Sequence, residues 1–177
     1  MAANERSDLK LHLHHAPIEI ERKFLIANDA WKHFIVGSVN IRDGLIASYK
    51  NRKVRMRISD QIAVITIKGP RRGIARAEYE YEIPLADAEV IMSNICGDDT
   101  LEKQRYLVED AGTIWHIDVY GGILMGVVIA EIELKQEDQK FALPPWIEKE
   151  VTGNEFYKKI NLAAARRATR TSTAVQE

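Results

Sequence analysis

The chain has 177 residues, which is about one domain of ordinary size, and 46% of them are hydrophobic, so a sizeable core can form. The 25 Lys and Arg residues nearly balance the 26 Asp and Glu residues, and the formal charge of -1 excludes a grossly basic nucleic-acid-binding chain and a disordered polyanion. A single cysteine excludes an internal disulfide framework and is typical of a reducing compartment.

Residues 1–16 are polar and predict a flexible N-terminal tail that contains His12, His14 and His15. Metal binding by this histidine cluster is the less favoured interpretation, because the cluster has one spacer and no partner motif. The segment lacks the apolar core of a secretion signal, and no apolar run approaches the ~20 residues of a membrane span. We therefore expect a cytoplasmic protein with no membrane partner.

From residue 17 onward the hydrophobic pattern is mostly of period two, which is typical of strands with two different faces. The short connections at 60–61 and 110–112 are similar to hairpin turns, and the spacing of the strands suggests an antiparallel meander. Eight strands are predicted, at about 17–26, 38–48, 52–59, 61–68, 76–83, 100–109, 113–120 and 126–135.

Helices are expected between and after these strands. Asn28 can cap a short helix over 29–36, and Pro84 precedes a helix over about 85–95. Asn154 can cap a last helix that reaches about residue 167, and a flexible tail is expected over 168–177. The sequence therefore predicts one α+β domain over 17–167, an eight-stranded antiparallel β-barrel with helices packed outside.

One face of the predicted strands carries most of the charge, and the signs sort by strand. Glu19, Glu21 and Lys23 follow one another on the first strand, and Arg55 and Arg57 on the third. Patterning alone favours an outward face on which these charges are solvated. The opposite face, however, is apolar almost throughout and needs helices to cover it, so the charged face would line the inside of a closed barrel.

A bore lined with charge is physically demanding. Like charges at alternate positions of a strand lie about 7 Å apart, and they repel strongly in a low dielectric. Clustered Arg and Lys side chains are stable there with a polyanion, and neighbouring carboxylates are stable with a hard divalent cation such as Mg²⁺ or Mn²⁺. A polyphosphate that carries a bound metal satisfies both requirements.

Charged motifs occur in a fixed order along the chain: EIERK at 19–23, RMR at 55–57, TIKG at 66–69, RAEYEYE at 76–82, EKQRY at 102–106, DVY at 118–120, AEIE at 130–133 and EVTG at 150–153. This ordered set resembles the motifs of the CYTH superfamily, the triphosphate tunnel metalloenzymes. The resemblance extends from about residue 17 to about residue 164. ExExK alone is a weak signal, whereas the ordered set is specific.

The resemblance implies a β-barrel tunnel that binds a triphosphate together with Mg²⁺ or Mn²⁺. The chain is most similar to the short bacterial branch associated with tripolyphosphatase activity, so we expect a metal-dependent hydrolase that cleaves the terminal phosphoanhydride of inorganic tripolyphosphate. Two alternatives stay open, a class IV-type adenylate cyclase and a non-catalytic protein that binds polyphosphate or nucleotides. A homodimer is a family expectation, and no nucleic-acid partner is expected.

The resemblance also implies site roles, position by position. Lys103 is a candidate catalytic residue that steers the attacking water, and Glu78 is a candidate that holds a second metal or its water. The candidate metal ligands are Glu19, Glu21, Asp118, Glu131 and Glu133. The candidate phosphate-binding residues are Lys23, Arg55, Arg57, Lys68, Arg76 and Arg105. Leu45 stands where members of this branch often have a tyrosine, so turnover or substrate preference is expected to differ.

Overall fold

The computed structural model describes residues 17–174, and it gives side chains as far as residue 169. The expected N-terminal tail, with His12, His14 and His15, lies outside these residues. All eight expected strands are present: β1 (Ile18–Ile26), β2 (Ile35–Tyr49), β3 (Arg52–Ser59), β4 (Ile62–Lys68), β5 (Ala75–Ile83), β6 (Thr100–Asp110), β7 (Thr113–Tyr120) and β8 (Val128–Glu133). A short further strand, β9 (Ile147–Glu150), extends the sheet beside β1 and is not predicted by the sequence pattern.

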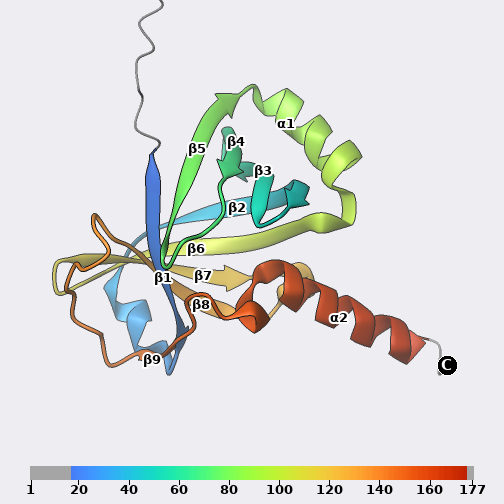
Figure 1. The fold of residues 1–177 in the computed structure, drawn as a ribbon. Helices are drawn as coiled ribbons and strands as arrows, with labels where there is room; N and C mark the ends of the chain where they lie inside the picture. Colours follow the sequence, from blue (N-terminus) through green and yellow to red (C-terminus); the bar gives the residue numbers. More distant parts are fainter. Residues whose placement is uncertain (1–16, 175–177) are drawn as a thin grey trace, which may run out of the picture.

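The eight strands form a closed antiparallel barrel in the order β1-β5-β4-β3-β2-β6-β7-β8 (Figure 1). Strand β1 closes it, because residues 18–20 pair with residues 75–77 of β5 while residues 21–25 pair with β8. The order is not a simple meander, since β1 does not pair with β2 and β5 does not pair with β6. Helical segments connect both of these strand pairs and carry the chain across the barrel.

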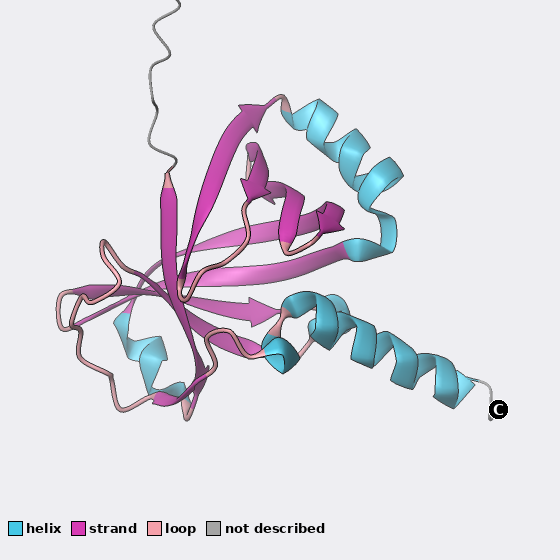
Figure 2. Cartoon of the chain, viewed as in Figure 1, coloured by secondary structure: helices cyan, strands magenta, loops and turns pink. Residues whose placement is uncertain are grey.

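The helices begin near the expected positions, and Figure 2 shows them around the strands. The segment η1 (Asp29–Phe34) is a 3-10 helix capped by Asn28, and α1 (Leu85–Ile91) continues as a π-helical turn, η2 (Met92–Cys96). Asn154 caps only the 3-10 turn η5 (Glu155–Tyr157). The last helix, α2 (Lys159–Ala174), extends beyond the expected end near 167, because no Gly or Pro interrupts it. The remaining turns are η3 (Gly97–Asp99) and η4 (Gly122–Leu124).

Buried apolar side chains form clusters in two places. Two clusters lie on the outer face of the barrel, and a third fills one end of its interior. On the outside, Met56 and Ile58 of β3 pack against Met92 of η2, and a second cluster surrounds Trp115. A third cluster joins Tyr120 of β7 to α2 and η4. Since Tyr120 lies two positions after Asp118, both side chains are on the inner face, and α2 therefore closes an end of the bore. None of the described helices is long and apolar enough to span a membrane.

Gly44 of β2 allows η2 to pack closely on the barrel. A Cβ atom at this position would lie 2.5 Å from the sulfur of Cys96 and 2.6 Å from the sulfur of Met92. We expect Gly44→Ala to lower the free energy of unfolding by about 1–3 kcal/mol through overpacking, measured by urea denaturation. In the control variant Gly37→Ala, the new Cβ meets only Leu107 at an ordinary 3.5 Å. Equal unfolding midpoints for the two variants would contradict this packing.

Candidate active site: a charged bore

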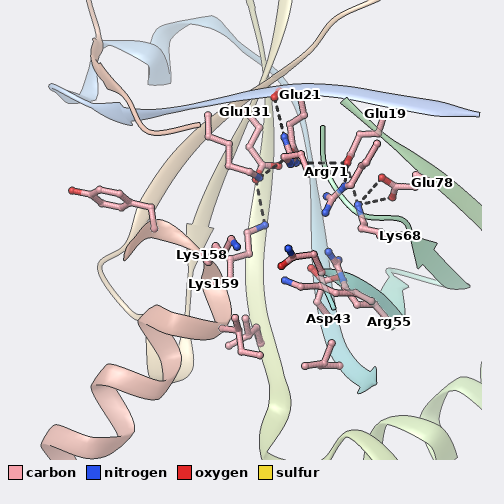
Figure 3. Close-up of a pocket in the computed structure, with 18 of the residues that line it drawn as sticks. Glu19, Glu21, Asp43, Arg55, Lys68, Arg71, Glu78, Glu131, Lys158 and Lys159 are labelled. Carbon is pink, nitrogen blue, oxygen red and sulfur yellow. Dashed lines mark hydrogen bonds and ion pairs between the residues drawn. The ribbon is translucent and has the colours of Figure 1, made fainter. Parts of the chain in front are cut away.

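The interior of the barrel contains a cavity of about 870 Å³, lined by alternate residues of the strands and by the start of α2 (Figure 3). The charged face of the strands therefore points inward, and Glu21 at its centre is only 5% exposed. This geometry decides between the two orientations that patterning left open. The bore is closed toward α2 by apolar side chains and carries ionic side chains along the rest of its wall.

Most of the expected site residues lie on the wall of this cavity, namely Glu19, Glu21, Lys23, Arg55, Arg57, Lys68, Arg76, Glu78, Arg105, Glu131 and Glu133. Two others, Lys103 and Asp118, lie on the inner face but do not line the cavity, and their side chains are 1% and 0% exposed. Lys103 Nζ donates to Asp118 Oδ2 at 2.5 Å. Neither side chain lines the cavity, but Asp118 contacts Arg105, which does.

At one side of the bore, Glu19 and Glu78 share the ammonium group of Lys68. Lys68 Nζ lies 3.0 Å from Glu19 Oε1 and 2.6 Å from Glu78 Oε2, and Arg76 donates to the other oxygen of Glu19. Burial, together with the hydrogen bond to Glu19, raises the pKa of Glu78 to about 7, although the charge of Lys68 opposes the shift. Burial alone would raise the pKa of Glu19 as well, but Glu78, Lys68 and Arg76 hold it below its ordinary value. Glu78 is therefore about half protonated near neutral pH, whereas Glu19 stays ionised.

Glu21 and Glu133 are directly opposite each other on β1 and β8. Glu21 is paired with Lys23 Nζ at 3.1 Å and with Arg71 Nη2 at 2.8 Å. The side chain of Glu133 is 61% exposed, and its nearest basic group is His116 Nδ1 at 3.8 Å. Burial raises the pKa of Glu133, and the charges of Glu21, Glu19 and Glu131 add to this, although Arg105 opposes it. Glu133 is therefore only weakly neutralised, whereas Glu21 beside it has two basic partners.

On another side of the bore, Arg55 and Arg57 converge on one carboxylate that the sequence motifs do not identify, that of Asp43. Arg57 Nε donates to Asp43 Oδ1 at 3.0 Å, and Arg55 donates to the same oxygen. Burial alone would raise the pKa of Asp43, but Arg55, Arg57 and Lys103 hold it well below its usual range. Asp43 therefore fixes both guanidinium groups at the wall of the cavity.

Next to the apolar end that α2 covers, the bore contains a dense group of ion pairs. Arg105 donates to Asp118 Oδ1 at 2.7 Å and to Glu131 Oε2 at 2.6 Å, and Lys23 donates to Glu131. Lys159, at the first turn of α2, adds its ammonium group 3.3 Å from Glu131 Oε1. Burial and the charge of Lys159 lower the pKa of Lys103 to about 7, against the attraction of Asp118.

The site contains residues that sequence reasoning missed: Asp43, Lys53, Arg71, Lys158 and Lys159. Asp43 has a sequence signal, because it is an acidic residue inside a predicted strand. Lys158 and Lys159 also have a sequence signal, because they form a pair of lysines near the start of the expected last helix. Arg71 has none, because it lies in a loop where alternation carries no information. Leu45 also lines the cavity.

The carboxylates differ in how well they fit a divalent cation. Within residues 17–169, no group of three or more His, Cys, Asp or Glu side chains is arranged to hold a metal ion. The oxygens of Asp118 and Glu131 are occupied by basic groups, whereas Glu133 has little neutralisation and faces Glu21 across the strands. Carboxylate oxygens in excess of basic partners are the donor set of hard cations. Glu133 therefore offers largely free oxygens to such an ion, whereas Glu19 and Glu21 fit it only after their own basic partners move aside.

Comparisons with known proteins agree with this fold. The family model of the CYTH domain matches residues 17–171. An inorganic triphosphatase of Acetivibrio thermocellus is 42% identical over 144 residues, which are 81% of this chain and 92% of that protein. An inorganic triphosphatase of Nitrosomonas europaea is 33% identical over 151 residues, which are 82% of this chain and 96% of that protein.

Solved structures resemble the chain over a similar length. The crystal structure of an inorganic triphosphatase superposes with a TM-score of 0.59 at 31% identity, over 82% of this chain and 97% of that one. A putative adenylate cyclase of Bacillus halodurans superposes with a TM-score of 0.53 at 18% identity, over 70% of this chain and 84% of that one. At that identity, the second likeness is a likeness of fold alone.

Proposed function

The chain belongs to the CYTH domain family, and on this premise we propose that it is a metal-dependent inorganic triphosphatase. It binds tripolyphosphate in the charged bore and hydrolyses the terminal phosphoanhydride. The observation that carries this proposal is the bore itself, in which basic side chains from several strands surround a cavity next to carboxylates that lack full neutralisation. The names of two relatives that each match more than four-fifths of this chain support the same activity.

In this proposal the phosphate oxygens are held by the wall of basic side chains. Arg55 and Arg57 present donors that Asp43 keeps in place, and forked guanidinium donors match phosphate oxygens well. The remaining phosphate-binding residues are Lys23, Lys68, Arg76 and Arg105. Glu19, Glu21 and Glu133 would hold Mg²⁺ or Mn²⁺, which supplies charge neutralisation at the phosphate oxygens when bound.

The proposed hydrolysis is an in-line attack of water on the terminal phosphorus, with pyrophosphate as the leaving group. Glu78 has a pKa of about 7 and lines the cavity, so its carboxylate is suited to accept the proton of that water near neutral pH. Lys103 is proposed to act as a positioning residue through Asp118, which in turn orients Arg105. Asp118 has the least support as a metal ligand, because its side chain is fully buried and does not line the cavity. Glu131 lines the cavity but is held by Lys23, Arg105 and Lys159.

A phosphate-release assay across substrates tests this proposal. Tripolyphosphate, thiamine triphosphate and ATP are each incubated with the protein in Mg²⁺ and in Mn²⁺, and the ATP samples are also assayed for cyclic AMP. We expect the fastest phosphate release with tripolyphosphate. Cyclic AMP without phosphate release would instead identify a cyclase. A raised melting temperature with tripolyphosphate but no release would identify a binding protein.

Titration of Lys53 should couple substrate binding to proton uptake. Burial and the positive charges of Arg55, Arg76, Lys158 and Lys159 lower the pKa of Lys53 to about 8. A bound polyanion favours the charged ammonium and raises the pKa of Lys53. Above about pH 8 the free Lys53 is mostly neutral, so substrate binding makes it take up a proton. Below about pH 7 Lys53 is already protonated, and binding takes up no proton there. Calorimetry in two buffers of different ionisation enthalpy should show less uptake for Lys53→Met than for the wild type near pH 9. Identical uptake in the two proteins would contradict this role.

Other expectations from the sequence remain proposals. We propose that the protein works in the cytoplasm, without nucleic-acid partners. A homodimer also remains a prediction, and sedimentation of the purified protein at several concentrations measures it. A single species with the mass of one 20.1 kDa chain at all concentrations would contradict the dimer.

A further inference from the structure

Arg71 places a guanidinium group between the acidic side chains of β1 (Figure 3). Its Nη2 atom lies 2.8 Å from Glu21 Oε1 and 3.9 Å from Glu19 Oε2. The side chain is 22% exposed and lines the cavity. A cation of the protein itself therefore occupies the space next to two of the carboxylates that fit a divalent metal ion.

The loop that carries Arg71 holds this side chain in place. Arg71 Nη1 donates to the backbone oxygens of Ile74 and Glu21, at 3.2 Å and 3.4 Å, and the amide of Glu21 donates to the oxygen of Ile74. The guanidinium is thus fixed by backbone acceptors as well as by a carboxylate. The ion pair between Arg71 and Glu21 is therefore more ordered than an exposed surface ion pair, in which two long side chains hold only each other.

Arg71 differs from the other basic residues of the site in the contacts that are lost when its side chain moves away from Glu21. Lys23 and Lys68 project from strands, and each also neutralises a second carboxylate, Glu131 or Glu78. Arg71 projects from the loop between β4 and β5, and its further partners are backbone oxygens. Moving its side chain away from Glu21 breaks hydrogen bonds to two backbone oxygens, whereas moving Lys23 or Lys68 also removes the ammonium partner of Glu131 or Glu78.

We propose that Arg71 is a built-in counter-ion of Glu19 and Glu21, and that a divalent cation binds to these carboxylates by displacing it. The inference rests on the metal assignment in the proposed function. In the metal-free protein, the guanidinium offsets repulsion among the carboxylates of β1 and Glu133. On metal binding, the ion and the guanidinium compete for the same oxygens, so Arg71 weakens metal affinity while it stabilises the metal-free barrel.

Metal titration without substrate tests this competition. Isothermal titration of Mn²⁺ into Arg71→Ala should show a dissociation constant about three- to five-fold lower than the wild type, as removal of one partly exposed charged competitor implies. The melting temperature of metal-free Arg71→Ala should be lower than that of the wild type, and saturating Mn²⁺ should remove most of the difference. Arg71→Gln, which keeps most of the length and loses the charge, should tighten Mn²⁺ binding similarly and serves if the alanine variant fails to fold.

Arg72 provides the matched control, because it is the adjacent arginine of the same loop and is exposed. Arg72→Ala should leave the Mn²⁺ affinity within two-fold of the wild type. Equal or weaker Mn²⁺ binding by the Arg71 variants, equal tightening by Arg72→Ala, or no Mn²⁺ binding by any of the proteins would each overturn the inference. Phosphate release by the wild type is measured on the same samples, so loss of the proposed function and loss of this inference are read separately.

Discussion

The variant Glu21→Gln should release phosphate from tripolyphosphate at least about 100-fold more slowly than the wild type. Loss of this carboxylate weakens binding of the metal ion, and the charge of the transition state is then poorly neutralised. Glutamine keeps the shape and one acceptor oxygen but loses the charge that faces Glu133 across β1 and β8. The basic partners Lys23 and Arg71 would remain, so the site would repel a divalent cation. Initial rates over a range of Mn²⁺ concentrations measure both the loss and its dependence on metal.

The control for this experiment is Glu82→Gln, on an exposed position of β5. It removes the same charge from the same kind of strand and should leave the rate unchanged. Circular dichroism and the melting temperature show whether both variants keep the fold. A well-folded Glu21→Gln protein with the wild-type rate would contradict the role of β1 in metal binding.

Replacing Arg57 with glutamine should act mainly on substrate binding. One charge-assisted contact to a phosphate oxygen is worth ~1.5–3 kcal/mol, so we expect KM for tripolyphosphate to rise by about ten- to a hundred-fold, with a smaller effect on kcat. Asp43 would keep its contact with Arg55, which limits the structural disturbance. Steady-state kinetics at saturating metal separate the two constants.

Arg52→Gln is the matched control, because Arg52 is exposed at the start of the same strand. Its kinetic constants should equal those of the wild type. A KM of Arg57→Gln that stays within two-fold of the wild type would show that the guanidinium pair is a structural ion pair with Asp43 and does not bind phosphate.

Alternation along the strands is the part of the site that the sequence could predict. Once Glu21 is assigned to one face, Glu19 and Lys23 must share it, because side chains on a strand alternate strictly. The orientation of that face depended on a global feature, the closure of β1 against β5 at residues 18–20 and 75–77. The large apolar area of the opposite face indicated this closure, since burying that area favours the charged face inside.

Depth and loop geometry are the parts that the sequence could not predict. Lys103 and Asp118 lie on the same face of their strands as Arg105. Their side chains are nevertheless buried and do not line the cavity, because apolar residues such as Tyr120 fill that end of the bore. Arg71 reaches Glu21 only through the conformation of a loop between β4 and β5. Such positions depend on how distant elements pack, which local periodicity does not report.

One diffraction experiment tests most directly whether the charged bore is the place where metal and triphosphate meet. Crystals are soaked with Mn²⁺ and a slowly hydrolysed tripolyphosphate analogue, and anomalous scattering locates the metal. The account predicts a manganese peak within coordination distance of Glu21 and Glu133, and phosphate density in contact with Arg57. Ligand bound only on the outer wall, or a bore that stays empty at saturating concentrations, would contradict it.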